Sequence, residues 1–508
     1  MRDWLKREPI VIVSARGALL RDVRGRQYLD ANSSIWTNLH GHGHPALNAA
    51  LRRQLQKIAH SSALGLANEP ASLLAQRLVE AANLPLHELL PRSGKSCEPQ
   101  NRPSPIAHRK LAKVFFSDDG STAMEVALKL AYEFARRTRG VGEPGFLSLQ
   151  DAYHGDTVGA LSLGHIARFH QAYAGLRFKS DAVMAPYCYR CPFNRARPER
   201  ADAREYRRCR WECVDQVERR FASRQKRGNP YAAMVVEPLI QGAAGMIPQP
   251  AGWLSQVAAI VRGHGAQLIA DEVMTGFGRT GFAPVRPGDG PATERNPDGR
   301  RARAAKMRHG REAGPTLFAS HHEGVQPDFL VLAKGLTGGY LPMAATLTTQ
   351  AVFDAFLGEY EEFKTFFHGH SFTANQLGAA AALASLDLLQ SPGSIRARER
   401  LQETLRDESR SLWGFRNVGD VRQVGLIVGV ELVKDWRTRQ SLDLRWRAGQ
   451  RVCQAMARRG VLTRPIGDVI VLMPPYGSSP AQVRRMVQAL GQALRQVFGH
   501  SPLRSTAW

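Results

Sequence analysis

Short apolar runs alternate with helical patterns through the middle of the chain, and this alternation limits the possible folds more than any other feature. A helical pattern covers 121–135, and the apolar runs are KVFFS (113–117), GFLSL (145–149), AAMVVEPL (232–239), AQLIADEV (266–273) and DFLVLAKG (328–335). Strands that alternate with helices form parallel sheets with helices on both faces. We therefore predict an α/β fold with a mostly parallel sheet, in which ligands bind at the carboxyl ends of the strands.

The first 60 residues predict a hairpin followed by a helix. Residues 17–30 alternate as two short strands would, with Gly25 in the turn between them. A helix is expected from Pro45 onward. Its apolar residues recur at three- and four-residue steps and predict one stripe that faces the core: Leu47, Leu51, Leu55 and Ile58.

Three further segments differ from the alternating region. Residues 391–508 combine helical patterns with short strand patterns and predict a smaller α+β domain. Residues 91–108 are rich in Pro, Ser and polar side chains, which is typical of an exposed loop. Residues 283–316 hold many Arg, Pro and Gly residues and predict a disordered surface insertion.

Composition and charge exclude several classes of protein. The 508-residue chain is 43% hydrophobic and 22% charged, as globular proteins are, and no apolar run approaches the roughly 18 residues that a membrane span needs. Its first residues are too charged for a secretory leader, so we expect a cytoplasmic protein with no membrane partner. The formal net charge of +24 leaves a nucleic-acid-binding protein as an alternative. We expect no nucleic-acid partner, because the basic excess is spread along the chain.

Three strand ends carry complementary chemistry. Lys334 ends one apolar run, where a desolvated amine can form a Schiff base with a carbonyl. Asp271 ends another run, where its carboxylate can keep a pyridine nitrogen protonated. Residues 117–122 (SDDGST) lead from a third run into a helix, whose N-terminal N–H groups suit a phosphate. Taken alone, these features are more often a solvated lysine, a helix cap or structural ion pair, and a capping sequence, but together they describe pyridoxal 5′-phosphate.

These residues belong to longer strings that resemble a known family. The strings are ADEVMTGFGRTG (270–281), LAKGLTGGYLPMAATLTT (332–349), AYHGDTVGALS (152–162), VVEPLIQGAAGM (235–246) and FFHGHSFTANQLG (366–378). With them the chain resembles the class III aminotransferases of pyridoxal-phosphate fold type I over nearly its whole length. That resemblance implies a large domain with a mostly parallel sheet and a small α+β domain built from both ends of the chain. It implies small-domain segments at 1–58 and 376–508, and a large cofactor-binding domain at 59–375 that contains both insertions.

Within this class the chain most resembles the branch that aminates 8-amino-7-oxononanoate in biotin biosynthesis. The supporting strings are SSIW (33–36), HGHGHP (40–45), Arg464-Pro465 and LMPPY (472–476). This branch gives 7,8-diaminononanoate with S-adenosyl-L-methionine or L-lysine as the amino donor. Other class III branches usually have Gln where this chain has Met274, which counts against them. A class III transaminase of broad specificity for ω-amines stays open as the alternative.

The resemblance also implies roles for single residues. Lys334 would hold the cofactor covalently and move a proton, and Asp271 would pair with the pyridine nitrogen. Tyr153 would lie on the cofactor ring. The phosphate would be bound by Gly120 and Ser121 and, from the neighbouring subunit of an obligatory homodimer, by His370 and Ser371. The implied substrate-binding residues are Ile35, Trp36, Tyr153, Lys334, Gly369 and Arg464, with Arg464 gripping a carboxylate.

Two departures from the family pattern carry expectations of their own. Many relatives have Trp where this chain has Ile35, and the Ile-Trp form resembles a branch in which lysine is the donor. Family chains also begin with a Trp-His-Pro-aromatic-Thr segment that this chain lacks, so we expect the native start to lie upstream of Met1.

Four of the six cysteines form two close pairs, Cys188 with Cys191 and Cys209 with Cys213. The paired spacing is compatible with a zinc or iron–sulfur site. Four reduced cysteines in a loop are the favoured alternative, because amino transfer on pyridoxal phosphate needs no metal. We therefore expect no metal centre and keep the cluster as a weak candidate.

Overall fold

The computed structural model describes residues 8–83, 109–281 and 316–499. The predicted start upstream of Met1, the loop at 91–108 and all but one residue of the insertion at 283–316 lie outside these ranges. No helix within the described ranges is long and apolar enough to cross a membrane.

The predicted N-terminal hairpin is confirmed and extended by one strand. Strands β1 (Ile12–Arg16), β2 (Leu19–Asp22) and β3 (Gln27–Asp30) pair in antiparallel order, and Gly25 takes a φ of +79° between β2 and β3. β3 also pairs in parallel with β15 (Val461–Leu462), more than 400 residues later in the chain. The N-terminal strands are therefore held by the C-terminal part of the protein.

Helix α2 (Pro45–Lys57) forms as predicted, but its predicted core stripe is only partly buried. Leu47 is fully buried, whereas Leu55 is 57% exposed and Ile58, just past the helix end, is 45% exposed. The helix packs against α12 (Gln376–Gln390). The prediction fails for the outer half of the stripe because no other element of the described chain covers it. Helix α3 (Glu69–Ala82) follows and packs on the same α12.

The central sheet has seven strands and is mostly parallel, as predicted. The strand order is β4-β12-β11-β10-β7-β5-β6, and β12 alone runs antiparallel to its neighbours within the described chain. The strands are β4 (Leu111–Ser117), β5 (Gly145–Leu149), β6 (Asp181–Val183), β7 (Tyr231–Val236), β10 (Gln267–Asp271), β11 (Phe329–Leu332) and β12 (Ala344–Thr349).

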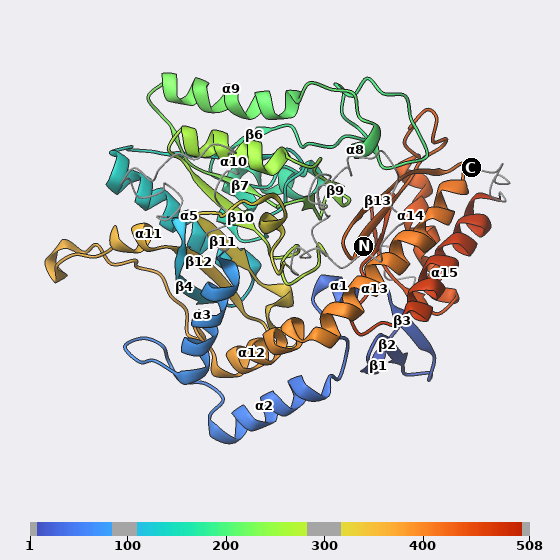
Figure 1. The fold of residues 1–508 in the computed structure, drawn as a ribbon, viewed down its shortest axis with the longest axis horizontal. Coiled ribbons are helices and arrows are strands. Elements are labelled where there is room, and N and C mark those ends of the chain that lie inside the picture. The colour runs from blue at the N-terminus through green and yellow to red at the C-terminus, as the bar shows by residue number, and fades with distance from the viewer. Residues whose placement is uncertain (1–7, 84–108, 282–315, 500–508) are drawn as a thin grey trace, which may run out of the picture.

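Helices cover both faces of this sheet (Figure 1). Helix α5 (Gly120–Arg139) packs on one face, and α9 (Glu212–Lys226) and α10 (Trp253–Gly263) pack on the other. Successive residues of β7 point to opposite faces, so Val235 joins the core cluster under α5 while Met234 joins the one under α9 and α10. Both faces are apolar, which explains why the strands appear in the sequence as continuous apolar runs.

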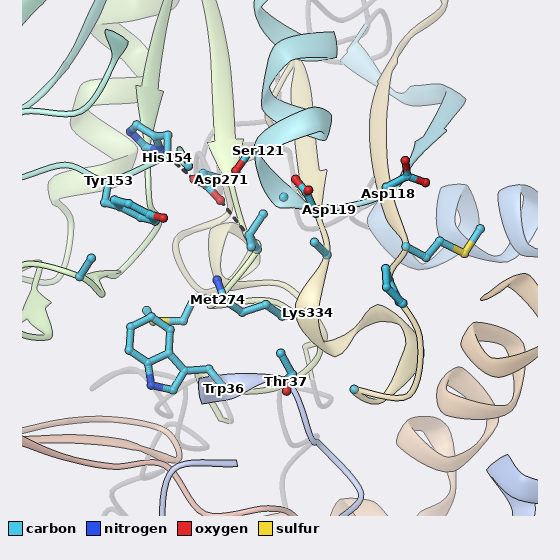
Figure 2. A pocket seen from close by; sticks show the side chains of 18 of the residues that line it. Trp36, Thr37, Asp118, Asp119, Ser121, Tyr153, His154, Asp271, Met274 and Lys334 are labelled. Carbon is cyan, nitrogen blue, oxygen red and sulfur yellow. Dashed lines mark hydrogen bonds and ion pairs between the residues drawn. The ribbon is translucent and has the colours of Figure 1, made fainter. Parts of the chain in front are cut away.

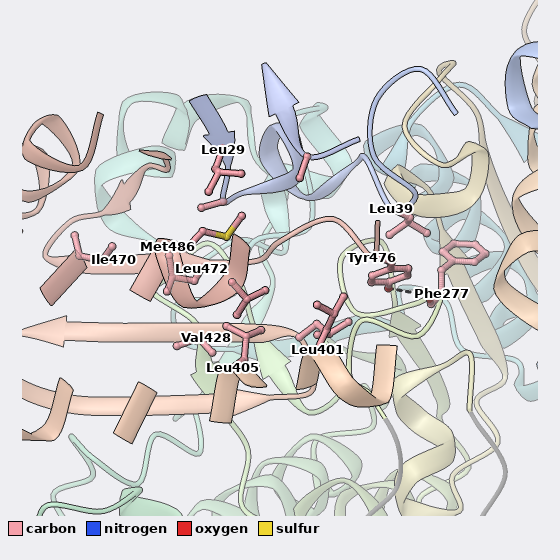
Figure 3. Close-up of a cluster of buried hydrophobic side chains, with 14 of the residues drawn as sticks. Leu29, Leu39, Phe277, Leu401, Leu405, Val428, Ile470, Leu472, Tyr476 and Met486 are labelled. Carbon is pink, nitrogen blue, oxygen red and sulfur yellow. Dashed lines mark hydrogen bonds between the residues drawn. The ribbon is translucent and has the colours of Figure 1, made fainter. Parts of the chain in front are cut away.

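The C-terminal part contains a second, antiparallel sheet of order β13-β14-β17-β16. Its strands are β13 (Val418–Val424), β14 (Ile427–Leu432), β16 (Pro465–Ile466) and β17 (Val469–Leu472), and its helices are α13 (Pro392–Ser409), α14 (Ala448–Arg458) and α15 (Pro480–Phe498). Leu29 of β3 shares one buried cluster with Val428, Leu472 and Met486, shown in Figure 3. The two ends of the chain thus share a core, and the division at residues 58 and 376 stays a prediction.

Short elements complete the fold. They are α1 (Ser33–Trp36), α6 (Val158–Ser162), α7 (Ala167–His170), α8 (Ala203–Tyr206), β8 (Ile240–Gln241), β9 (Ile247–Pro248), α11 (Gln350–Asp354) and several 3₁₀ turns, among them η3 (Ala319–Glu323) and η4 (Lys334–Thr337).

Candidate active site

A cavity of about 440 Å³ lies at the carboxyl ends of the parallel strands (Figure 2). Residues that follow β4, β7, β10 and β11 line it together with residues from α1 and from the segment before β12. Parallel strands end at one edge of a sheet, so side chains distant in the sequence meet there. The lining includes Trp36, Gly120, Ser121, Tyr153, His154, Glu237, Asp271, Met274 and Lys334.

Lys334 begins η4, immediately after Ala333 and strand β11. Burial lowers the pKa of its amine, and this effect is opposed by the negative charges of Asp271 and Glu237. Its backbone has a φ of +34°, in the region that non-glycine residues rarely adopt, and its Nζ lies 5.5 Å from the ring centre of Trp36. A lowered amine pKa favours the uncharged form, which is what attack on a carbonyl requires.

Asp271 is the last residue of β10 and is 5% exposed. Its Oδ2 lies 2.7 Å from Nδ1 of His154, and its Oδ1 accepts a hydrogen bond from the N–H of Val273 at 3.1 Å. The His154 side chain is fully buried. The carboxylate is therefore held in one orientation at the cavity wall.

The N-terminus of α5 faces the same cavity (Figure 2). Asp119 and Thr122 form a reciprocal capping box, with the Asp119 side chain accepting from the N–H of Thr122 at 2.9 Å. Gly120 and Ser121 begin this 20-residue helix. The N-terminal N–H groups of such a helix, together with its dipole, favour an anion such as phosphate.

Trp36 is brought over Lys334 by an unusual backbone. Ser33, Ser34, Ile35 and Trp36 all have positive φ values, between 46° and 71°, so the segment drawn as α1 is a left-handed turn. Two hydrogen bonds fix it: Ser33 Oγ donates to the carbonyl of Met473 at 2.7 Å, and Trp36 Nε1 donates to Asn32 Oδ1 at 2.9 Å. Such a turn is costly for residues with side chains and persists where surrounding contacts hold it.

Glu237 and His154 also line the cavity, although neither was predicted as a site residue from the sequence. Glu237 directly follows the apolar strand β7, much as Asp271 is the polar residue that ends β10. Burial raises the pKa of Glu237 to about 7, assisted by Asp271 and opposed by His154. The signal was therefore present in the sequence as a polar residue at a strand end.

Glu272 is a buried neighbour of Asp271 that is not among the cavity-lining residues. Its carboxylate accepts hydrogen bonds from the backbone N–H groups of Ala319 and Ser320 and from Ser320 Oγ at 2.7 Å. Burial raises its pKa to about 7, and these hydrogen bonds oppose the rise. Glu272 thus anchors the η3 segment behind the strand end.

Several predicted site residues lie outside the cavity lining of the single chain. They are Ile35, Gly369, His370, Ser371 and Arg464. Ile35 is 45% exposed, and Gly369, Ser371 and Arg464 are also exposed. His370 Nδ1 lies 3.1 Å from Oδ2 of the cavity residue Asp118. The predicted roles of these five residues stay predictions.

The cysteine cluster gains no support as a metal centre. Within residues 8–83, 109–281 and 316–499, no group of three or more His, Cys, Asp or Glu side chains is arranged to hold a metal ion. Cys188 and Cys213 are buried, and burial raises their pKa values to about 12 and about 11.

The residues present fit pyridoxal phosphate. One cavity combines a buried amine at Lys334, a fixed carboxylate at Asp271 and the N-terminus of α5. These groups match the aldehyde, the pyridine nitrogen and the phosphate of that molecule. Tyr153 adds an aromatic ring at the wall, and its hydroxyl donates to Asp156 Oδ2 at 2.8 Å.

Comparison with known proteins identifies relatives over nearly the full length. A family model described as Aminotransferase class-III matches residues 3–291 and 310–494. An adenosylmethionine-8-amino-7-oxononanoate aminotransferase of Geobacter sulfurreducens is 40% identical over 499 residues, covering 98% of this chain and 95% of the relative.

Solved structures agree with the sequence relatives. A structure with the same enzyme name from Methanocaldococcus jannaschii aligns with a TM-score of 0.78 and 34% identity, covering 97% of this chain and 95% of the other. An amine transaminase from an uncultivated Pseudomonas species, in its pyridoxal-phosphate-bound form, aligns with a TM-score of 0.78 and 29% identity, covering 97% and 96%.

Proposed function

The chain belongs to the class III aminotransferases, and we propose that it transfers an amino group to 8-amino-7-oxononanoate, giving 7,8-diaminononanoate in biotin biosynthesis. It is an enzyme that uses pyridoxal phosphate. The observation that carries the proposal is the single cavity in which Lys334, Asp271 and the N-terminus of α5 meet. The choice of acceptor is supported by relatives named adenosylmethionine-8-amino-7-oxononanoate aminotransferase, one of which is 41% identical to this chain.

Each group in the cavity has a proposed role. Pyridoxal phosphate would supply an electron sink and a carrier for the amino group. Lys334 would hold it covalently and, once released, would move a proton at the substrate carbon, which its lowered pKa favours. Asp271 would keep the ring nitrogen protonated, and His154 orients Asp271. Gly120 and Ser121 would bind the phosphate through backbone N–H groups, and Tyr153 would pack on the ring.

The donor in this proposal is S-adenosyl-L-methionine or L-lysine. Trp36 lines the cavity, whereas Ile35 does not, so the effect of Ile35 on donor choice rests on the sequence pattern. Mixing the cofactor-loaded protein with each donor separately, and then with 8-amino-7-oxononanoate, tests the proposal through the absorbance of the cofactor. Reaction with simple ω-amines as donors, or amination of simple ketones, at an equal rate would favour the alternative, a class III transaminase of broad specificity for ω-amines.

We also propose that the protein is a homodimer and that its domains divide as the sequence predicts. We propose that it acts on small molecules and is located in the cytoplasm. Exposed apolar side chains on and after α2 support a dimer, among them Leu55, Ile58 and Leu64, the last 92% exposed. His370 and Ser371 lie outside the chain's own cavity lining, as residues that serve the partner's site would. Sedimentation gives the mass. A heterodimer of inactive Lys334→Ala and Ser371→Ala chains would regain activity at one of its two sites.

A further inference from the structure

Among the described residues, four carboxylates line the cavity, and one of them has a buried oxygen without a hydrogen-bond partner. Asp118 lies beside His370, Asp119 caps α5, and Asp271 is bonded to His154 and Val273. Glu237 is 6% exposed, and its Oε2 is buried with no hydrogen-bond partner among the described residues. A buried carboxylate oxygen without a donor is costly, so it is expected where a ligand supplies the donor.

The position of Glu237 indicates which ligand group it meets. Its Oε1 accepts a hydrogen bond from the N–H of Gly242 at 2.9 Å. Gly242 packs against Met274 and Trp36, because a Cβ atom there would lie 2.5 Å from Met274 Sδ and 3.4 Å from Trp36 Cζ3. The carboxylate is thus attached to the wall that Trp36 and Met274 form. It is also near enough to Lys334 for its charge to raise the pKa of that amine.

We propose that Glu237 binds the ammonium group that the acceptor carries on the carbon next to its reacting carbonyl. This inference rests on the proposed acceptor, 8-amino-7-oxononanoate, whose amine and ketone lie on adjacent carbons. The ketone must come to the region of Lys334 to react, so the amine enters the same buried space. A carboxylate with an unused oxygen in that space provides a charge-assisted hydrogen bond.

The ionisation of Glu237 is compatible with this role. Burial raises its pKa to about 7, and the titratable groups that face it are His154, Asp271 and Lys334. An ammonium group placed beside the carboxylate favours the ionised form and so lowers that pKa. A ligand without the amine leaves the buried carboxylate unpaired and is therefore rejected.

The test compares two alcohols that lack the reacting carbonyl, 8-amino-7-hydroxynonanoate and 7-hydroxynonanoate, which differ in the amine alone. Their dissociation constants are measured by calorimetry with the protein loaded with pyridoxamine phosphate, which has no aldehyde with which the ligand's amine could condense. We expect the amine-bearing ligand to bind about ten- to a hundredfold more tightly to wild type, as a hydrogen bond to a charged group provides. In Glu237→Gln this ratio should fall to about one. Glu272→Gln is the matched control and should keep the wild-type ratio, because its carboxylate does not line the cavity.

Several results would overturn the inference. A Glu237→Gln variant with the wild-type ratio would do so, and a simultaneous change in cofactor absorbance would assign Glu237 to the cofactor instead. If Glu237→Gln does not fold, the wild-type ratio is followed from pH 5.5 to 8: it should rise as Glu237 ionises, and a constant ratio contradicts the proposal. If wild type aminates 8-amino-7-oxononanoate but does not bind the amine-bearing alcohol more tightly, this inference is refuted and the proposed function stands. If wild type does not aminate 8-amino-7-oxononanoate, the proposed function is refuted as well.

Discussion

Gly120 gives the sharpest test of how the cavity is built. A Cβ atom on Gly120 would lie 2.8 Å from Cγ1 and 3.0 Å from Cγ2 of Val273. Carbon atoms in contact are normally about 3.5 to 4.0 Å apart, so in Gly120→Ala the α5 N-terminus and Val273 must separate. Val273 cannot move freely, because its N–H donates to Asp271. The substitution therefore strains the proposed phosphate site and the carboxylate beside it together.

Overpacking of this kind costs about 1 to 3 kcal/mol. If the overpacking destabilises the cofactor-bound protein more than the cofactor-free protein by this amount, the affinity for pyridoxal phosphate falls about fivefold to a hundredfold, since about 1.4 kcal/mol corresponds to a tenfold change in dissociation constant. The assay titrates cofactor-free protein with pyridoxal phosphate and follows absorbance. Gly393→Ala is the matched control, because Gly393 also lies in the first turn of a helix but has nothing within 4 Å of its Cβ position. Equal affinities in Gly120→Ala, Gly393→Ala and wild type would refute the reasoning.

Four further predictions address single residues. Lys334→Ala should lower turnover by at least about 10⁴-fold without loss of fold, since one amine binds the cofactor and moves the proton. In wild type, borohydride should fix the cofactor to the peptide that contains Lys334, and labelling of another lysine would contradict this assignment. Asp271→Asn should retain cofactor but slow the half-reaction by about 10² or more, which stopped-flow absorbance measures, and a near-normal rate would make Asp271 only structural. Lysine should react measurably as donor, and Ile35→Trp should shift the ratio of half-reaction rates up to about tenfold toward S-adenosyl-L-methionine; inert lysine in the wild type would contradict this. The pKa of Glu272, raised to about 7, means that its contribution to stability is full below its ordinary pKa of 4.5 and is lost as pH rises through 7. The free energy of unfolding should therefore fall by roughly 3 kcal/mol more in wild type than in Glu272→Gln between pH 5 and 8, and parallel curves would disprove this.

The sequence by itself determined five of the seven strands of the central sheet, β4, β5, β7, β10 and β11, and three of the groups in the cavity. Both faces of the sheet are covered, so these five strands are apolar runs that could be recognised locally. Strands β6 and β12 were not predicted. Parallel strands all end at one edge, so a polar residue after an apolar run is placed at that edge whatever the order of the strands. For this reason the sequence alone suffices to assign Lys334, Asp271 and the 117–122 segment to one site. The same rule, applied to β7, would have found Glu237.

Only the tertiary structure decided which side chains pair across the site. His154 bonds to Asp271 across 117 positions of the chain, and β3 pairs with β15 across more than 400. The antiparallel direction of β12 and the left-handed turn at 33–36 are likewise fixed by distant partners, such as the carbonyl of Met473. Hydrophobic periodicity indicates which residues tend to be buried. It does not indicate which element covers them, because burial depends on contacts between segments far apart in the chain. The exposed half of the α2 stripe is an example.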